Sequence, residues 1–236
     1  MIWQDSGVKL PLLDWESTLY TGNLSVEHRW MCGVLETSSK EIAVQQLIMS
    51  GSPSDACDLT LDPNTAHRRL SLSEDNRKVT RVREDQSYPD HPDRFDYWFQ
   101  VLGREALTGR CYWEVEWEGR VLIGVTYRGI TRRGVGDDSV LGGNNKSWVL
   151  YCSDGGYSAR YNGTETALPL RPAGSTRVGV YLDRPAGSLS FYRVSPGGGG
   201  SSDTLTHLHT FWSSFTQEDL LPGVWVLLGS ASLCRL

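Results

Sequence analysis

CYWEVEWE, at residues 111–118, alternates apolar and polar side chains, and this stretch decides the fold. One face carries Cys111, Trp113, Val115 and Trp117, and the other carries Tyr112 and three glutamates. Successive side chains of a β-strand point to opposite faces of its sheet. The alternation therefore predicts a half-buried antiparallel strand.

Further short apolar runs lie on the C-terminal side of this stretch, with turn signals between them. Residues 121–127 follow at the spacing of a hairpin, and residues 177–182 and 188–192 flank a DRPAG turn at 183–187. In that turn proline presets φ and glycine accepts a positive φ. Short strands with little helical period predict an all-β fold, namely a two-sheet antiparallel β-sandwich.

Composition places the 236 residues among ordinary globular proteins, since 39% are hydrophobic and 22% are charged. The net charge of −5 argues against phosphate-driven binding of nucleic acid. No apolar run approaches the ~20 residues that span a bilayer, and the first residues lack a secretory signal, so we expect no membrane insertion. Five scattered cysteines, an odd number without a CxxC pair, predict free thiols in the cytoplasm.

The chain divides near residue 53. Residues 1–53 have mixed character and contain one candidate helix, at 39–49, with Ser38 or Ser39 as its cap. GSPS at 51–54 is typical of a linker. We therefore expect a short, partly helical N-terminal segment that need not be fully ordered and has no assigned role. A single β-domain over residues 54–236 follows it.

Several motifs of this second part resemble those of PRY-SPRY domains. DLTLDPNTA at 58–66 and LSLSEDNRKV at 70–79 resemble the PRY segment, and GRCYWEVE at 109–116 resembles the first SPRY signature. Later matches, in the family's order, are IGV at 123–125, SWVL at 147–150, VGVYLD at 178–183 and GSLSFY at 187–192. The resemblance assigns about 54–107 to PRY and about 108–236 to SPRY. The sequence of the PRY segment especially resembles that of the C-terminal domains of fish tripartite-motif and NLR-type immune proteins.

This resemblance implies a bent, concanavalin-like sandwich whose loops bind a protein partner. It implies a role in innate immune recognition or in recruiting substrates to a ubiquitin ligase, with no cofactor, no metal and no catalysis in this chain. Ligase activity would need a RING domain, which the sequence lacks.

The resemblance also places partner contacts at five matching positions: Leu122, Tyr151, Ser153, Val224 and Trp225. In antibody-binding members two of these positions are acidic or aromatic, whereas here they are Leu122 and Ser153, which argues against antibody binding. Further aromatic candidates are Tyr97, Trp98, Tyr157 and Tyr161. For these four, packing in the core is the alternative, because large aromatic side chains are usually well buried.

Two alternatives to a protein-binding module stay open. Glu114, Glu116 and Glu118 share a strand face, as acidic residues do in some β-sandwich glycosidases, so one is carbohydrate binding or glycoside cleavage. The plain explanation of these glutamates is a solvated strand face. The other alternative is the C-terminal domain of a secreted, toxin-like assembly, since some pore-forming fish toxins carry similar domains.

A metal site is not expected. His207 and His209 fall on one face of a predicted strand and could supply two ligands. Zinc normally needs at least a third protein ligand, and no companion HxxH or CxxC motif is present.

Overall fold

The computed structural model describes residues 55–197 and 202–236. The predicted helix at 39–49 and the predicted boundary at residue 53 lie outside these residues. Within them, the elements are β1 Leu70–Ser73, β2 Lys78–Arg81, β3 Gln100–Leu102, β4 Arg110–Tyr127, the 3-10 helix η3 Asp137–Ser139, β5 Ser147–Ser153, β6 Gly156–Tyr161, β7 Thr164–Ala167, β8 Arg177–Asp183, β9 Ser188–Ser195, β10 Thr204–Trp212 and β11 Leu220–Leu233. In this part of the chain we find no helix long and apolar enough to cross a membrane.

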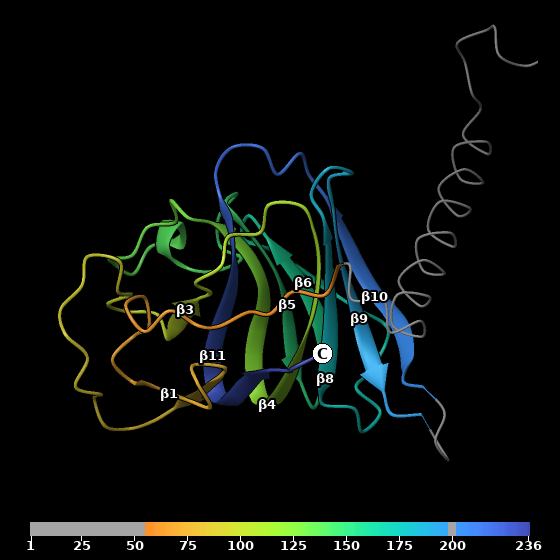
Figure 1. Cartoon of the computed structure of the whole chain (residues 1–236), viewed down its shortest axis with the longest axis horizontal. Coiled ribbons are helices and arrows are strands. Elements are labelled where there is room, and N and C mark those ends of the chain that lie inside the picture. Colours follow the sequence, from red (N-terminus) through yellow and green to blue (C-terminus); the bar gives the residue numbers. More distant parts are fainter. Residues whose placement is uncertain (1–54, 198–201) are drawn as a thin grey trace, which may run out of the picture. The chain divides into compact units, whose positions relative to one another are not determined.

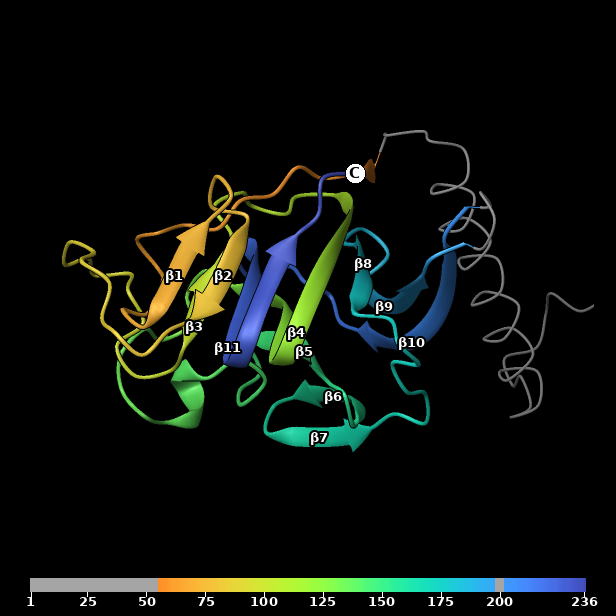
Figure 2. The same cartoon turned by 90° about the horizontal axis from the view of Figure 1, so that it is seen from below.

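Two β-layers are built from these strands, and they share β4 and β11. Hydrogen bonds join the strands in the order β1-β2-β11-β4-β5-β6-β7, and a branch of β8, β9 and β10 leaves this path at β4. Residues 110–116 of β4 pair with β8, and residues 120–126 pair with β5. The two layers face each other across the main core (Figures 1 and 2). The predicted antiparallel β-sandwich is confirmed.

β4 is one strand of 18 residues, and the hairpin expected between residues 118 and 121 is wrong. The chain passes through Gly119, at φ +80°, directly opposite Gly229, at φ +89°, without reversing direction. A Cβ at Gly119 would lie 2.5 Å from the Leu228 carbonyl oxygen, and a Cβ at Gly229 would lie 2.1 Å from that of Glu118. The paired glycines therefore let β4 and β11 bend together from one layer into the other. By contrast, the DRPAG turn does connect β8 to β9 as predicted, with Asp183 opposite Ser188.

The buried apolar side chains of the described residues form two large clusters and a small third one of Tyr112 and Tyr192. The main core lies between the layers, and its members include Trp113, Val115, Ile123, Leu150, Val180, Phe191 and Val226. The second cluster lies on the other face of β11, β4 and β5, and its members include Phe95, Leu122, Leu141, Val149 and Trp225. The segments before β3 and between β4 and β5 fold onto this outer face, so the sheet is covered there on both sides.

Two of the cysteines form a disulfide, which corrects the expectation of free thiols. Cys57 is bonded to Cys111 at the start of β4, with the Cα atoms 5.6 Å apart. Cys152 is buried and carries a free thiol, as does the partly buried Cys234. The pairing joins positions 54 residues apart, and it depends on the segment before β1 running beside β4.

Candidate functional site

Three of the predicted contact residues lie side by side across three strands. Trp225 of β11 is opposite Leu122 of β4, and Leu122 is opposite Tyr151 of β5. Residues opposite each other in a sheet point to the same face, so these side chains form one row on the outer face. Leu122 is fully buried at the centre of the row, whereas Trp225 is 9% exposed and Tyr151 is half-buried. Leu122 is thus the floor of this surface, and its neighbours provide the part that a partner can reach.

The segment before β3 adds two more predicted residues to this row. Trp98 meets Trp225 edge-on at 5.3 Å between ring centroids, and Tyr97 meets Trp98 edge-on at 5.0 Å. The indole N–H of Trp98 donates a hydrogen bond to Ser139 Oγ at 3.2 Å, which fixes its ring. Tyr97 stands out at 52% exposure.

We call this surface the aromatic face and define it by Tyr97, Trp98, Leu122, Tyr151, Ser153 and Trp225. Ser153 belongs to it because it lies two residues beyond Tyr151 on β5, where it is half-buried. The face joins side chains from residues 97 to 225, so it exists only in the folded domain.

Sequence reasoning missed one cation at the aromatic face. The guanidinium of Arg160 lies 5.2 Å from the centre of the Tyr151 ring and is held there by an ion pair with Glu165 at 2.7 Å. A cation over an aromatic ring is stabilised by the ring quadrupole. The signal was present in the sequence: a two-residue DG loop at 154–155 sets the β5–β6 register, and that register puts Arg160 diagonally beside Tyr151.

Three other predicted residues point away from the aromatic face. Val224 is buried on the opposite side of β11, in the main core. Tyr157 is also buried in that core, edge-on to Trp117 at 6.4 Å, and its burial raises the pKa of its hydroxyl. Tyr161 stacks on Trp148 at 5.4 Å, again on the inner side. The core-packing alternative therefore describes Tyr157, whereas Tyr161 is only partly buried at the edge of that core.

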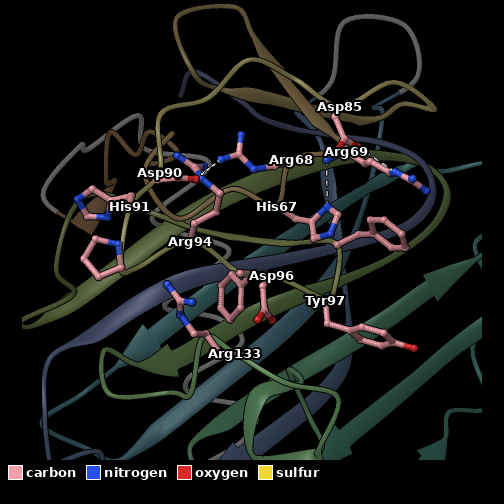
Figure 3. Close-up of a pocket in the computed structure, with 13 residues that line it drawn as sticks. His67, Arg68, Arg69, Asp85, Asp90, His91, Arg94, Asp96, Tyr97 and Arg133 are labelled. Atoms are coloured by element: carbon pink, nitrogen blue, oxygen red, sulfur yellow. Dashed lines mark hydrogen bonds and ion pairs between the residues drawn. The ribbon is translucent and has the colours of Figure 1, made fainter.

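A polar hollow of about 810 Å³ lies next to the aromatic face, and Tyr97 lines it (Figure 3). Two ion pairs lie in its walls: Arg69 contacts Asp85 at 3.0 Å, and Arg68 contacts Asp90. The imidazole Nδ1 of His67 accepts a hydrogen bond from the Arg69 backbone N–H at 2.9 Å, and burial lowers the pKa of His67. No sequence motif pointed to this hollow, because its residues come from two separate stretches, 67–69 and 85–99, and from Arg133.

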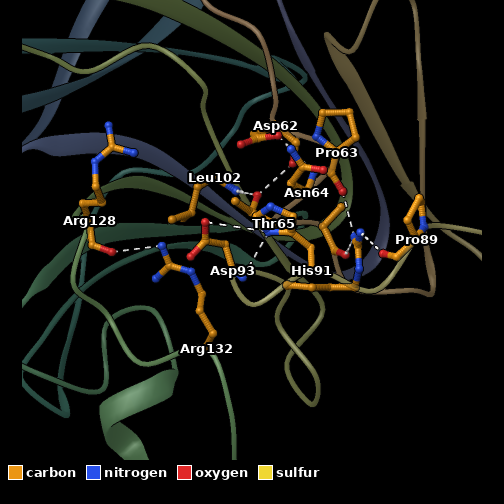
Figure 4. Close-up of polar contacts among 12 residues, drawn as sticks. Asp62, Pro63, Asn64, Thr65, Pro89, His91, Asp93, Leu102, Arg128 and Arg132 are labelled. Atoms are coloured by element: carbon orange, nitrogen blue, oxygen red, sulfur yellow. Dashed lines mark hydrogen bonds and ion pairs between the residues drawn. The ribbon is translucent and has the colours of Figure 1, made fainter.

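A buried arginine, Arg94, holds the segment that carries Tyr97 and Trp98. Arg94, only 6% exposed, donates hydrogen bonds to the carbonyl oxygens of Pro63 at 2.7 Å, Ala66 at 2.6 Å and Pro89 at 2.8 Å. The DPNT turn at 62–65 presents the first of these carbonyls, and Ala66, directly after the turn, presents the second. The Thr65 hydroxyl accepts a hydrogen bond from the Leu102 N–H at 2.9 Å (Figure 4). The DLTLDPNTA motif is thus explained by a scaffold role close to the site.

The glutamate face proposed for glycoside cleavage is not a uniformly solvated face. Glu114 is 4% exposed, accepts a hydrogen bond from the Tyr112 hydroxyl at 2.7 Å and forms an ion pair with Arg177 at 3.3 Å. Glu116 and Glu118 are exposed. Glu114 is thus tied into the fold by Tyr112 and Arg177, and the strand face carries one buried and two exposed carboxylates.

The two histidines do not share a face, which corrects the sequence-based expectation. A β-bulge between His207 and His209 shifts the register, so that His207 is opposite Tyr192 and His209 is opposite Phe191. These neighbours on β9 point to opposite sides of the sheet. Within residues 55–197 and 202–236, no group of three or more His, Cys, Asp or Glu side chains could hold a metal ion.

Family models match most of the described chain. The SPRY domain matches residues 110–233, and the SPRY-associated domain, PRY, matches residues 59–107. The chain belongs to the PRY-SPRY family. The expected resemblance and the expected fold are confirmed.

Relatives of this PRY-SPRY chain include toxin subunits and tripartite-motif proteins. It is 44% identical to stonustoxin subunit beta of Synanceia horrida over 162 residues, which cover 68% of this chain and 22% of the toxin subunit. It is 41% identical to tripartite motif-containing protein 16 of Mus musculus over 174 residues, 72% of this chain and 30% of that protein. The chain thus spans less than a third of either relative.

A solved structure of the TRIM65 PSpry domain has the same fold. The TM-score is 0.67 at 28% identity, and the match covers 78% of this chain and 93% of that one. The match therefore extends over nearly the whole of an independently solved PRY-SPRY domain.

Proposed function

We propose that residues 55–236 are a protein-recognition module that binds its partner through the aromatic face. One observation carries this proposal: Trp98, Tyr151 and Trp225, from three distant segments, are brought together on one face of the sheet. Trp, Tyr and Arg are the residues that most often dominate binding energy at protein interfaces. The rings rest on the second apolar cluster, so little side-chain entropy is lost when a partner binds.

An unsatisfied donor adds to this argument. The indole N–H of Trp225 is buried and has no hydrogen-bond acceptor in the described part of the chain. A buried donor without an acceptor costs roughly 1–3 kcal/mol, and this cost is recovered if a partner displaces the side chains that cover the N–H and supplies a carbonyl. A protein partner offers such carbonyls along its backbone.

In a longer gene product, we infer, this module recruits a substrate to a ubiquitin ligase or recognises a ligand in innate immunity, in the cytoplasm. The similarity to tripartite motif-containing protein 16 supports this inference. The module itself binds and performs no chemistry. Charge favours a protein over a nucleic acid as its partner, since the net charge is −5.

Proximity labelling in cells, followed by pull-down with purified chain, tests the proposal. Tyr97→Ala combined with Tyr151→Ala removes two accessible rings without opening the core beneath Leu122. We expect the double variant to lose at least about 2 kcal/mol of binding free energy, or roughly 30-fold in Kd. Circular dichroism and thermal unfolding should match those of the parent chain.

Trp212→Ala is the matched control. Trp212 is an aromatic side chain on β10, 60% exposed and far from the aromatic face in the strand order. Its variant should capture the same partners as the parent chain. Capture that survives in the double variant but fails in Trp212→Ala would show that the binding surface lies elsewhere.

A second candidate function is that of a domain in a secreted, toxin-like assembly. Two observations favour it: the 44% identity to stonustoxin subunit beta and the disulfide between Cys57 and Cys111. Disulfides persist mainly in oxidising compartments. Alkylation of thiols in cells that produce the full gene product separates the two candidates. An oxidised pair in secreted protein supports the second, and reduced thiols in cytoplasmic protein support the first.

A further inference from the structure

The sandwich is open between two of its edge strands. In the described chain, β7 pairs only with β6, and β10 pairs only with β9. A crevice of about 390 Å³ lies between these edges, lined by Ala159, Tyr161, Asn162, Thr164, Thr166, His209 and Phe211. Its residues lie on the inner side of the sandwich, so this site is separate from the aromatic face.

Inward-facing positions of β7 carry hydroxyls instead of aliphatic side chains. Thr164 is opposite Tyr161 and Thr166 is opposite Ala159, so both threonines point to the side of the main core. Even so, every residue of β7 is exposed. At these positions a sandwich normally buries apolar residues. Exposed threonines here mean that the space in front of them is not filled by the described chain.

Aromatic rings form the other wall of the crevice. Tyr161 stacks on the buried Trp148, with 11° between the ring planes, and Phe211 lies 6.5 Å from Tyr161. His209 meets Phe211 edge-on at 4.4 Å. Trp148 is itself fixed by edge contacts to Tyr127 and Phe215 in the core, so the wall is preformed.

Among the described residues that line the crevice, none is acidic and none is a lysine or an arginine. Burial, and then the neighbouring His207, lower the pKa of His209, so its imidazole is neutral at neutral pH. The polar hollow beside the aromatic face differs sharply, with four arginines and three aspartates in its walls. The crevice therefore suits a ligand that is neutral, carries hydroxyl groups and has an apolar ring face.

We propose that this crevice binds a neutral sugar ring of a glycan. The hydroxyls of Thr164 and Thr166 and the amide of Asn162 can each donate and accept hydrogen bonds, as the hydroxyls of a sugar require. Tyr161 and Phe211 cover its C–H face. The volume lies at the lower end of the ~300–1,000 Å³ that ligand pockets occupy.

A peptide strand fits this crevice less well than a sugar does. An added strand needs a long, regular edge to pair with, and β7 has only four residues. The edge of β10 is interrupted by the bulge between His207 and His209, and such bulges obstruct pairing with another strand. These edges favour a compact ring over an extended chain.

Saturation-transfer difference NMR on the full chain tests the proposal with four neutral probes: lactose, maltotriose, mannotriose and N,N′-diacetylchitobiose. We expect saturable transfer to the ring protons of at least one probe. Thr166→Glu places an unpaired carboxylate at the wall and should weaken that binding at least ~10-fold, because desolvating the charge is costly. Phe211→Leu keeps the apolar volume but removes the ring, and should also reduce transfer to the C–H protons.

Ala167→Glu is the matched control. Ala167 is the next residue on β7, is exposed and is opposite Ser158, so it points to the outer face. Its variant should bind the probe like the parent chain. Absence of saturable transfer from all four probes overturns the proposal, and so does binding that Thr166→Glu and Ala167→Glu leave equal. If no sugar binds and Thr166→Glu instead abolishes capture of a peptide, the crevice is a peptide site and the sugar proposal is wrong.

Discussion

Replacing Arg94 by methionine should destabilise the domain by about 3 kcal/mol. Three hydrogen bonds from the buried guanidinium, at 2.6 to 2.8 Å, hold the carbonyls of Pro63, Ala66 and Pro89. At ~1.5 kcal/mol net for each charge-assisted bond, their loss costs roughly 4–5 kcal/mol. Arg94 is only 6% exposed, so its charge is partly desolvated in the fold, and this burial lowers its pKa. Methionine recovers that part of the cost and keeps the apolar stem, so about 3 kcal/mol remains.

Urea unfolding followed by tryptophan fluorescence measures this difference. With a slope of ~2 kcal/mol per molar urea, the midpoint should fall by roughly 1.5 M. Arg133→Met is the matched control, since Arg133 is exposed and forms no hydrogen bond or ion pair in the described chain. The free energy of unfolding of this variant should differ from that of the parent chain by less than ~0.5 kcal/mol. A loss below about 1 kcal/mol in Arg94→Met would refute the scaffold role of this side chain.

Two further predictions concern the disulfide and the dependence of stability on pH. Replacing Cys57 and Cys111 by serine should lower the free energy of unfolding by about 4 kcal/mol, as expected for a loop of 54 residues. Reductant should lower the urea midpoint of the parent chain to that of the double variant. A parent chain whose midpoint does not change with reductant would contradict the disulfide. Burial lowers the pKa of His67 and of His209 below 6.5, so the unfolded state binds protons first as the pH falls. The free energy of unfolding should therefore decrease as the pH falls from about 6.5 towards the pKa values of the folded state. His209→Gln should make this dependence on pH less steep. An unchanged dependence in the variant, or stability gained on acidification, would contradict the lowered pKa of His209.

The alternation of apolar and polar residues, with the turn signals between strands, was sufficient to predict the two β-layers. The alternation in residues 111–118 placed Trp113 and Trp117 in the core, and the DRPAG turn connects two strands as expected. The continuity of β4 was not predictable in the same way. It depends on Gly119 lying opposite Gly229, which is 110 positions away along the chain, and a local reading of glycine there favours a turn.

Of the nine residues that the sequence predicted as partner contacts, six lie on the aromatic face, and Val224, Tyr157 and Tyr161 point to the other side of the sheet. Trp98, Tyr151 and Trp225 lie on one face as a binding surface requires, yet neither period nor resemblance showed that Leu122 would be fully buried. Its depth depends on the segments that fold over β4. His209 was mispredicted for a different reason: a β-bulge after His207 in β10 turns its side chain to the inner side.

β11 has a consequence for how this domain is made. The last strand of the described chain lies between β2 and β4 in the middle of the sheet, so β2, β3 and one edge of β4 lack this neighbour until residues 220–233 are synthesised. Folding must therefore wait until this strand has left the ribosome, and until then the apolar faces of β4 and β2 stay exposed to aggregation. A truncation before residue 220 removes the centre of the sheet and not its margin, so it should yield insoluble protein.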